Sequence, residues 1–73
     1  MDGRQLLLLR LEKAERQVAS GVALIARQEL IIDQLERYGH DSRAARDLLS
    51  LFECTQAFYV VECDGLRRQS RCP

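Results

Sequence analysis

The sequence lacks an excess of either charge, because eleven basic side chains balance eleven acidic ones. A protein that holds nucleic acid through its phosphates needs a basic surplus. Long apolar runs are missing too: leucines 6–9 are followed at once by Arg10, Glu12 and Lys13. The longest uncharged stretch, residues 17–26, has ten residues, whereas a membrane helix needs about 20. We therefore expect a cytoplasmic protein without a membrane span, and nucleic acid is not the partner we expect.

Residues that carry chemistry are also scarce. The chain has one histidine, His40, and no Cys-x-x-Cys pair, Glu-x-x-His pair, Gly-x-Ser-x-Gly motif or Gly-rich phosphate loop. His40 precedes Asp41, and such a pair can polarise a base, but the same turn offers no nucleophile. The sequence predicts a non-enzymatic protein with no catalytic residue, no cofactor and no metal.

Three cysteines, Cys54, Cys63 and Cys72, follow each other at intervals of nine residues. Nine residues turn a helix through about 900°, so neighbouring cysteines face opposite sides and cannot pair within one helix. We expect free thiols. An intersubunit disulfide through Cys72 is the alternative.

An apolar pattern with heptad spacing predicts a first helix over residues 3–38. It begins with a capping box made by Asp2 and Gln5. Two heptad positions form the predicted helix–helix seam: Leu7, Ala14, Gly21, Gln28 and Leu35 at d, and Leu11, Val18, Ile25 and Ile32 at a. A third position, g, adds Leu24, Ile31 and Tyr38, which makes the apolar face as wide as that of a bundle helix. A break at Ser20-Gly21, giving three helices, is the alternative, because glycine weakens a helix interior.

Residues 39–42, Gly-His-Asp-Ser, predict a tight turn. Gly39 suits the left-handed position that ends a helix, and Asp41 or Ser42 suits the cap of the next one. A second helix is expected over residues 43–68, with a frayed tail at 69–73. We predict one apolar stripe at Ala45, Leu48, Phe52, Thr55, Tyr59 and Leu66, a second at Leu51, Phe58 and Val61, and Leu49 at the edge. Gln28 and Thr55 are expected to interrupt the seam and fix its register.

These elements predict an all-α fold: one domain over residues 1–73, built as an antiparallel two-helix hairpin. Folding at residue 40 brings Ile32 to Leu49 and Gly21 to Tyr59, where the missing side chain leaves room for the phenol ring. The same fold leaves the first dozen residues and part of the second stripe uncovered, which indicates an interface. We expect two copies to form a four-helix bundle. The predicted core and interface residues are Leu7, Leu11, Val18, Ile25, Ile32, Leu35, Leu48, Phe52, Tyr59 and Leu66.

The predicted function is that of a small interaction, scaffold or regulatory protein that self-associates, with another helical protein as a further partner. Nucleic-acid association through an arginine-rich surface is the alternative, suggested by Arg67, Arg68 and Arg71. A metal or small-ligand site in the bundle is the less favoured alternative.

A set of short motifs supports a resemblance. They are Ile25-Ala26-Arg27-Gln28, Ile31-Ile32, Leu35-Glu36, Gly39-His40-Asp41-Ser42, Ala45, Leu48-Leu49, Phe52-Glu53 and Thr55-Gln56. Over residues 10–68 the chain resembles a group of short alphaproteobacterial proteins with a Gly-His-Asp-Thr turn between two helical stretches. It departs from their pattern at Ser42, Tyr59, Cys63 and Gly65, where Thr, His, Arg and Arg are expected. The resemblance implies a bacterial helical hairpin and supplies no activity or ligand.

Overall fold

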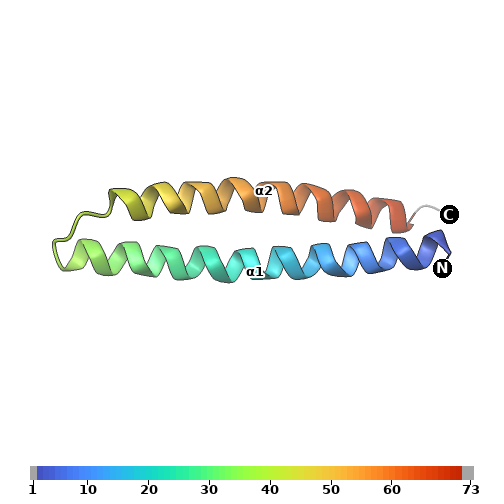
Figure 1. Ribbon diagram of the computed structural model, residues 1–73, viewed down its shortest axis with the longest axis horizontal. Helices are drawn as coiled ribbons and strands as arrows, with labels where there is room; N and C mark the ends of the chain where they lie inside the picture. Colours follow the sequence, from blue (N-terminus) through green and yellow to red (C-terminus); the bar gives the residue numbers. More distant parts are fainter. Residues whose placement is uncertain (1, 72–73) are drawn as a thin grey trace.

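The computed structural model describes residues 2–71 and contains two antiparallel helices, α1 (Gly3–Arg37) and α2 (Arg43–Arg71). The helices lie side by side along their whole length, and the chain reverses once between them (Figure 1). The resulting rod measures 56 × 16 × 14 Å between its outermost Cα atoms. The predicted all-α hairpin is confirmed, and α1 runs through Gly21 without a break.

Helix α1 begins with one half of the predicted capping box. The Asp2 carboxylate accepts a hydrogen bond from the Gln5 backbone N–H at 2.9 Å, which satisfies one of the amides left free at a helix start. Along the outer face, Arg16 pairs with Glu12 at 3.2 Å and Arg37 with Asp33 at 3.1 Å. Both pairs are exposed and four residues apart, so each stabilises the helix by only about 0.3–0.5 kcal/mol.

Gly39 ends α1 in the left-handed conformation, with φ of 75°. Its N–H donates to the Glu36 carbonyl at 3.2 Å, and the His40 N–H donates to the Leu35 carbonyl at 2.8 Å. These two bonds form a Schellman motif, which satisfies the last carbonyls of the helix. The predicted role of Gly39 is confirmed.

Two residues share the cap of α2. The Ser42 carbonyl accepts the first intrahelical bond, from the Arg46 N–H at 2.9 Å, while the Asp41 carboxylate accepts the Arg43 N–H at 3.0 Å. The Ser42 hydroxyl is occupied elsewhere, because it donates to Glu36 at 2.9 Å. The Glu36 carboxylate also receives the Arg46 guanidinium, so one acidic side chain ties the end of α1 to the start of α2.

The seam of α1 follows the predicted heptad throughout. Residues that are buried or half-buried alternate in steps of three and four, the spacing that keeps one stripe against a partner helix. Apart from Gln17, which lies beside the stripe, they are Leu7, Leu11, Ala14, Val18, Gly21, Ile25, Gln28, Ile32 and Leu35. Leu7 and Leu11 pack against a cluster made by Ala14, Cys63 and Leu66, so the expectation that this end of α1 is uncovered is wrong for these two leucines.

The seam of α2 differs from the predicted stripe. Leu48 is 41 % exposed and Thr55 is also exposed, whereas Leu49 and Gln56 occupy the seam. The seam residues of α2 are Ser42, Ala45, Leu49, Phe52, Gln56, Tyr59, Cys63, Leu66 and Ser70, with Gly65 half-buried beside them. The prediction was wrong because Gln56, Cys63 and Ser70 look polar or small, while the outward Leu48 looks like a core residue.

The C-terminal end is also longer than predicted. Helix α2 continues to Arg71, so residues 69–71 are helical rather than frayed. Residues 72–73 lie outside the described residues, and with them the alternative of a disulfide through Cys72.

The register follows from two contacts across the seam. Ala14 shares a buried cluster with Cys63, and Gly21 lies directly against the side chain of Gln56. A Cβ at Gly21 would overlap Gln56 Oε1, so the missing side chain makes room for the Gln56 amide. The prediction that it makes room for the ring of Tyr59 was wrong.

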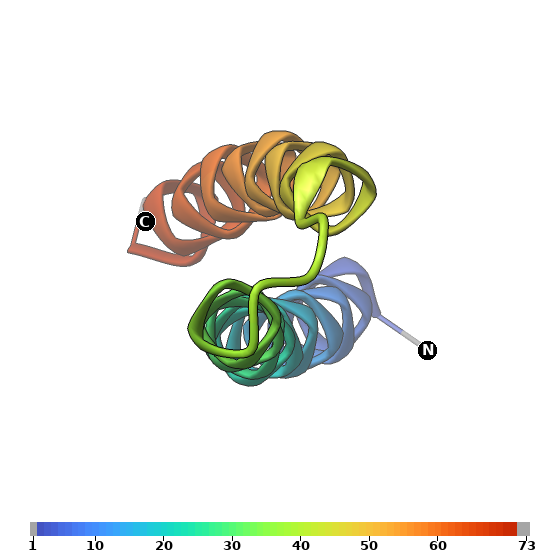
Figure 2. The same cartoon turned by 90° about the vertical axis from the view of Figure 1, so that its left-hand side faces the viewer.

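The two helices cross at a small angle, as the helices of a coiled coil do (Figure 2).

Candidate interaction surface

The seam has two edges, and one of them is charged. Arg46 of α2 reaches Glu36 of α1, and Arg67 of α2 lies 3.9 Å from Glu15 of α1. We call this the charged edge. These four side chains form ion pairs between the two helices of one chain.

The opposite edge is apolar. Both helices contribute large exposed side chains to it: Leu24 is 44 % exposed, Leu51 60 % and Phe58 74 %. We call this surface the apolar face, and its members are Leu24, Ile31, Leu48, Leu51 and Phe58. On α1, Leu24 and Ile31 are seven residues apart; on α2, Leu48, Leu51 and Phe58 are three and seven residues apart, so each set lies on one side of its helix. Leu24 and Leu51 also line the same groove, which places the two sets on the same side of the hairpin.

A groove runs between the helices on this face. One part, of about 270 Å³, is lined by Gly21, Leu24, Leu51, Phe52, Thr55, Gln56 and Tyr59. The adjoining part, of about 600 Å³, shares Gly21, Leu24 and Tyr59 and extends along α1 past Lys13, Arg16, Gln17 and Ser20. Gly21, Leu24 and Tyr59 lie where the two parts meet, and the Gln56 side chain fills the space beside Gly21. The groove is large enough to accept an aromatic or aliphatic side chain from a partner.

Two glutamines set the polar contacts inside the seam. Gln28 is buried, with 6 % of its surface exposed, and its Nε2 donates to the Ala45 carbonyl at 2.9 Å. Gln56 Nε2 donates to the Val18 carbonyl at 2.9 Å, while its Oε1 is buried without a hydrogen-bond partner. Gln28 was expected to interrupt the seam and does so. The role predicted for Thr55 belongs to its neighbour Gln56. The sequence signal for this role is Gly21, a residue without a side chain in the seam of α1.

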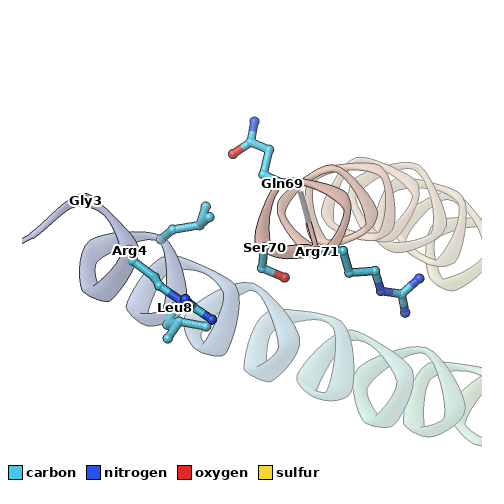
Figure 3. Close-up of a pocket in the computed structure, with 7 residues that line it drawn as sticks. Gly3, Arg4, Leu8, Gln69, Ser70 and Arg71 are labelled. Atoms are coloured by element: carbon cyan, nitrogen blue, oxygen red, sulfur yellow. The ribbon is translucent and has the colours of Figure 1, made fainter. Parts of the chain in front are cut away.

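A further cavity lies at the open end of the hairpin, between the start of α1 and the end of α2. It has a volume of about 390 Å³ and is lined by Gly3, Arg4, Leu7 and Leu8 of α1 and by Gln69, Ser70 and Arg71 of α2. Ser70 points toward α1, whereas Gln69 points away from it (Figure 3). The Ser70 hydroxyl donates to the Arg67 carbonyl of its own helix at 2.8 Å. The cavity therefore shows no cluster of polar groups aimed at a ligand.

The predicted core and interface residues are brought together, with one exception. Nine of them line the seam: Leu7, Leu11, Val18, Ile25, Ile32, Leu35, Phe52, Tyr59 and Leu66. Leu48 lies instead on the apolar face, outside the seam of its own chain. Most of the predicted residues therefore hold the hairpin together, and the surface available to a partner is made by others.

The turn does not assemble a reactive pair. His40 is exposed, and the Asp41 carboxylate beside it is engaged by the Arg43 guanidinium, with a closest approach of 2.7 Å. This ion pair lowers the pKa of Asp41 below its ordinary value of 3.8 and raises the pKa of Arg43. The pKa of Glu36 is lowered in the same way, chiefly by the hydrogen bond from Arg46 and then by that from Ser42. The hydrogen bonds and ion pairs that cause these shifts stabilise the turn.

Three further findings bear on function. Within residues 2–71, no group of three or more His, Cys, Asp or Glu side chains is placed to hold a metal ion. Neither α1 nor α2, as far as it is described, has the length and apolar character that crossing a membrane requires. In comparisons with known proteins, the chain matches no protein-family model, no curated protein and no solved structure.

Proposed function

We propose that this protein is a non-enzymatic helical interaction protein that acts as a homodimer, in which two hairpins form a four-helix bundle. The bacterial setting implied by the resemblance, and a place in the cytoplasm, are part of the proposal. The observation that carries it is the apolar surface that a single hairpin leaves in water.

The core of one chain is thin. In the part of the chain that the structure describes, the buried apolar residues are Ala14, Ile32, Cys63 and Leu66. A chain of this size gains only about 3–5 kcal/mol from its own core, and association is a common way to add to it.

The exposed surface supports the same conclusion. The chain exposes 5804 Å², whereas a compact monomer of its 8.4 kDa exposes about 4600 Å². The excess, about 1200 Å², is larger than the roughly 800 Å² that each partner buries in a stable interface of standard size. Packing two hairpins face to face removes surface of this order.

Sedimentation equilibrium over a range of protein concentrations tests the proposal. We expect a species of twice the 8.4 kDa chain mass at micromolar concentration, and helicity that falls when the dimer is diluted apart. A species of 8.4 kDa with full helicity at every concentration would contradict the dimer. Binding of a different helical protein by that monomer would then point to a heteromeric role.

A further inference from the structure

We propose that the dimer forms through the apolar face, with α1 of each copy opposite α2 of the other and Phe58 of each copy seated in the second copy's groove over Gly21. This inference rests on the proposed homodimer and specifies its geometry. Four features of the chain carry it.

The first feature is the contrast between the two edges. On the charged edge, Glu36 and Glu15 pair with Arg46 and Arg67 of the same chain. Docking a second copy there would remove these charged groups from water, which is costly. The apolar face offers large exposed side chains instead, so burying it is the favourable choice.

The second feature is the charge along the two sides of the groove. The side formed by α1 carries Arg10, Lys13 and Arg27 and no acidic residue. The side formed by α2 carries Glu62 and no basic residue. Placing α1 against α1 of the second copy would oppose like charges, whereas placing α1 against α2 opposes unlike ones. Charge complementarity of this kind fixes the orientation of an interface.

The third feature is the height of these residues along the rod. Because Gln56 lies against Gly21 and Cys63 lies in a cluster with Ala14, Phe58 is level with the part of α1 just before Gly21. By the same pairing Glu62 lies opposite residue 15, about 3 Å along the helix axis from Lys13. A two-fold axis parallel to the helices preserves height, so it brings Phe58 over the groove at Gly21 and Glu62 to Lys13 of the second copy. The contact is self-complementary, as a two-fold interface requires.

The fourth feature is Phe58 itself. It is 74 % exposed, and it stands one heptad along α2 from Leu51, which lines the groove. A large exposed aromatic ring on the same face as an apolar groove is typical of an interface hot spot.

The main test compares Phe58→Asp with Val22→Asp. Both replace an exposed apolar side chain, 74 % and 60 % exposed, so neither disturbs the seam of the hairpin. We expect Phe58→Asp to raise the dissociation constant of the dimer by about 100-fold or more, as loss of a hot spot does. Val22 lies on the charged edge, seven residues after Glu15 on α1, and Val22→Asp should change the constant by less than about threefold.

Charge exchange tests the orientation. Lys13 and Glu62 form no ion pair within the described part of one chain. Lys13→Glu and Glu62→Lys should each weaken the dimer by about threefold to tenfold, and the double variant should restore it. Additive weakening in the double variant would overturn the orientation.

The two proposals fail in different ways. A wild-type chain that stays monomeric contradicts the homodimer itself. A wild-type dimer that tolerates Phe58→Asp but dissociates with Val22→Asp leaves the homodimer intact and overturns the apolar face as its interface. Circular dichroism of each variant, at a concentration where it is monomeric, confirms that the hairpin is folded.

Discussion

The side chain of Gln56 occupies the space that Gly21 leaves open, and its Nε2 donates to the Val18 carbonyl at 2.9 Å. The two residues are therefore energetically coupled across the seam. Alanine at position 21 would gain about 1 kcal/mol in helix propensity, but its Cβ would displace the Gln56 amide.

A double-mutant cycle measures this coupling. Gly21→Ala should leave the free energy of unfolding almost unchanged in the native background, because the lost hydrogen bond, about 1 kcal/mol, offsets the gain in propensity. In the Gln56→Ala background the same change should stabilise the protein by about 1 kcal/mol. Gly65→Ala is the matched control: the nearest atom to its Cβ is Arg68 Nη2 at 3.9 Å, so its effect should be equal in both backgrounds. Identical effects of Gly21→Ala in both backgrounds, in urea denaturation, would contradict the coupling.

Gln28 should be sensitive to length. Gln28→Asn shortens the side chain by one methylene, and the amide then no longer reaches the Ala45 carbonyl from a site that is 6 % exposed. A buried amide without its partner costs about 1–3 kcal/mol, so the free energy of unfolding should fall by that amount. Gln34→Asn makes the same chemical change at an exposed position of the same helix and should cost less than about 0.5 kcal/mol. Equal losses of unfolding free energy in the two variants would show that the hydrogen bond from Gln28 to Ala45 does not stabilise the protein.

The two seams were not equally readable from the sequence. In α1 the heptad positions are filled mainly by Leu, Val and Ile, so its buried stripe could be predicted residue by residue. In α2 one row of the seam holds Ser42, Gln56, Cys63 and Ser70, and only Leu49 in that row is a large apolar residue. The outward Leu48 and Phe58 are more apolar than these four residues, which face inward. Hydrophobicity alone therefore predicts the wrong register for α2, since burial in the single chain is decided by the partner helix.

The candidate surface was predictable only in part. The width of the apolar pattern, with Leu24 and Ile31 beside the α1 seam, correctly indicated more apolar surface than one partner helix covers. The groove beside Gly21 could not be predicted, because it depends on where Gln56 lies in three dimensions. The charged edge likewise depends on Arg67 reaching Glu15 from the far end of the chain.

The turn should lose stability in acid through Glu36. Its pKa is lower in the folded protein than the ordinary 4.5, because Arg46 and Ser42 donate hydrogen bonds to the carboxylate. The contribution of Glu36 to the free energy of unfolding is therefore complete above pH 4.5, and it is lost as the pH falls through the lowered pKa of the folded protein. Urea denaturation at a series of pH values from about 7 to about 3 should show the decline, and Glu36→Gln should flatten it. Because the pKa of Asp41 is lowered from 3.8, the slope that remains in Glu36→Gln should lie at lower pH. A variant with the same pH profile as the wild type would contradict a role for Glu36.

The two described cysteines should differ in reactivity, since Cys54 is exposed and Cys63 is 1 % exposed in the core cluster with Ala14 and Leu66. A thiol reagent such as iodoacetamide should modify Cys54 rapidly in the folded protein. Cys63 should react only when the helices separate, so its labelling rate reports opening of the hairpin near its open end. Peptide mapping by mass spectrometry follows each site separately, and in denaturant the two rates should converge.

Because Val18 also packs on this cluster, Val18→Ala should accelerate labelling of Cys63 while leaving the labelling rate of Cys54 unchanged. Equal rates for both thiols in the native wild type would mean that the seam does not protect Cys63.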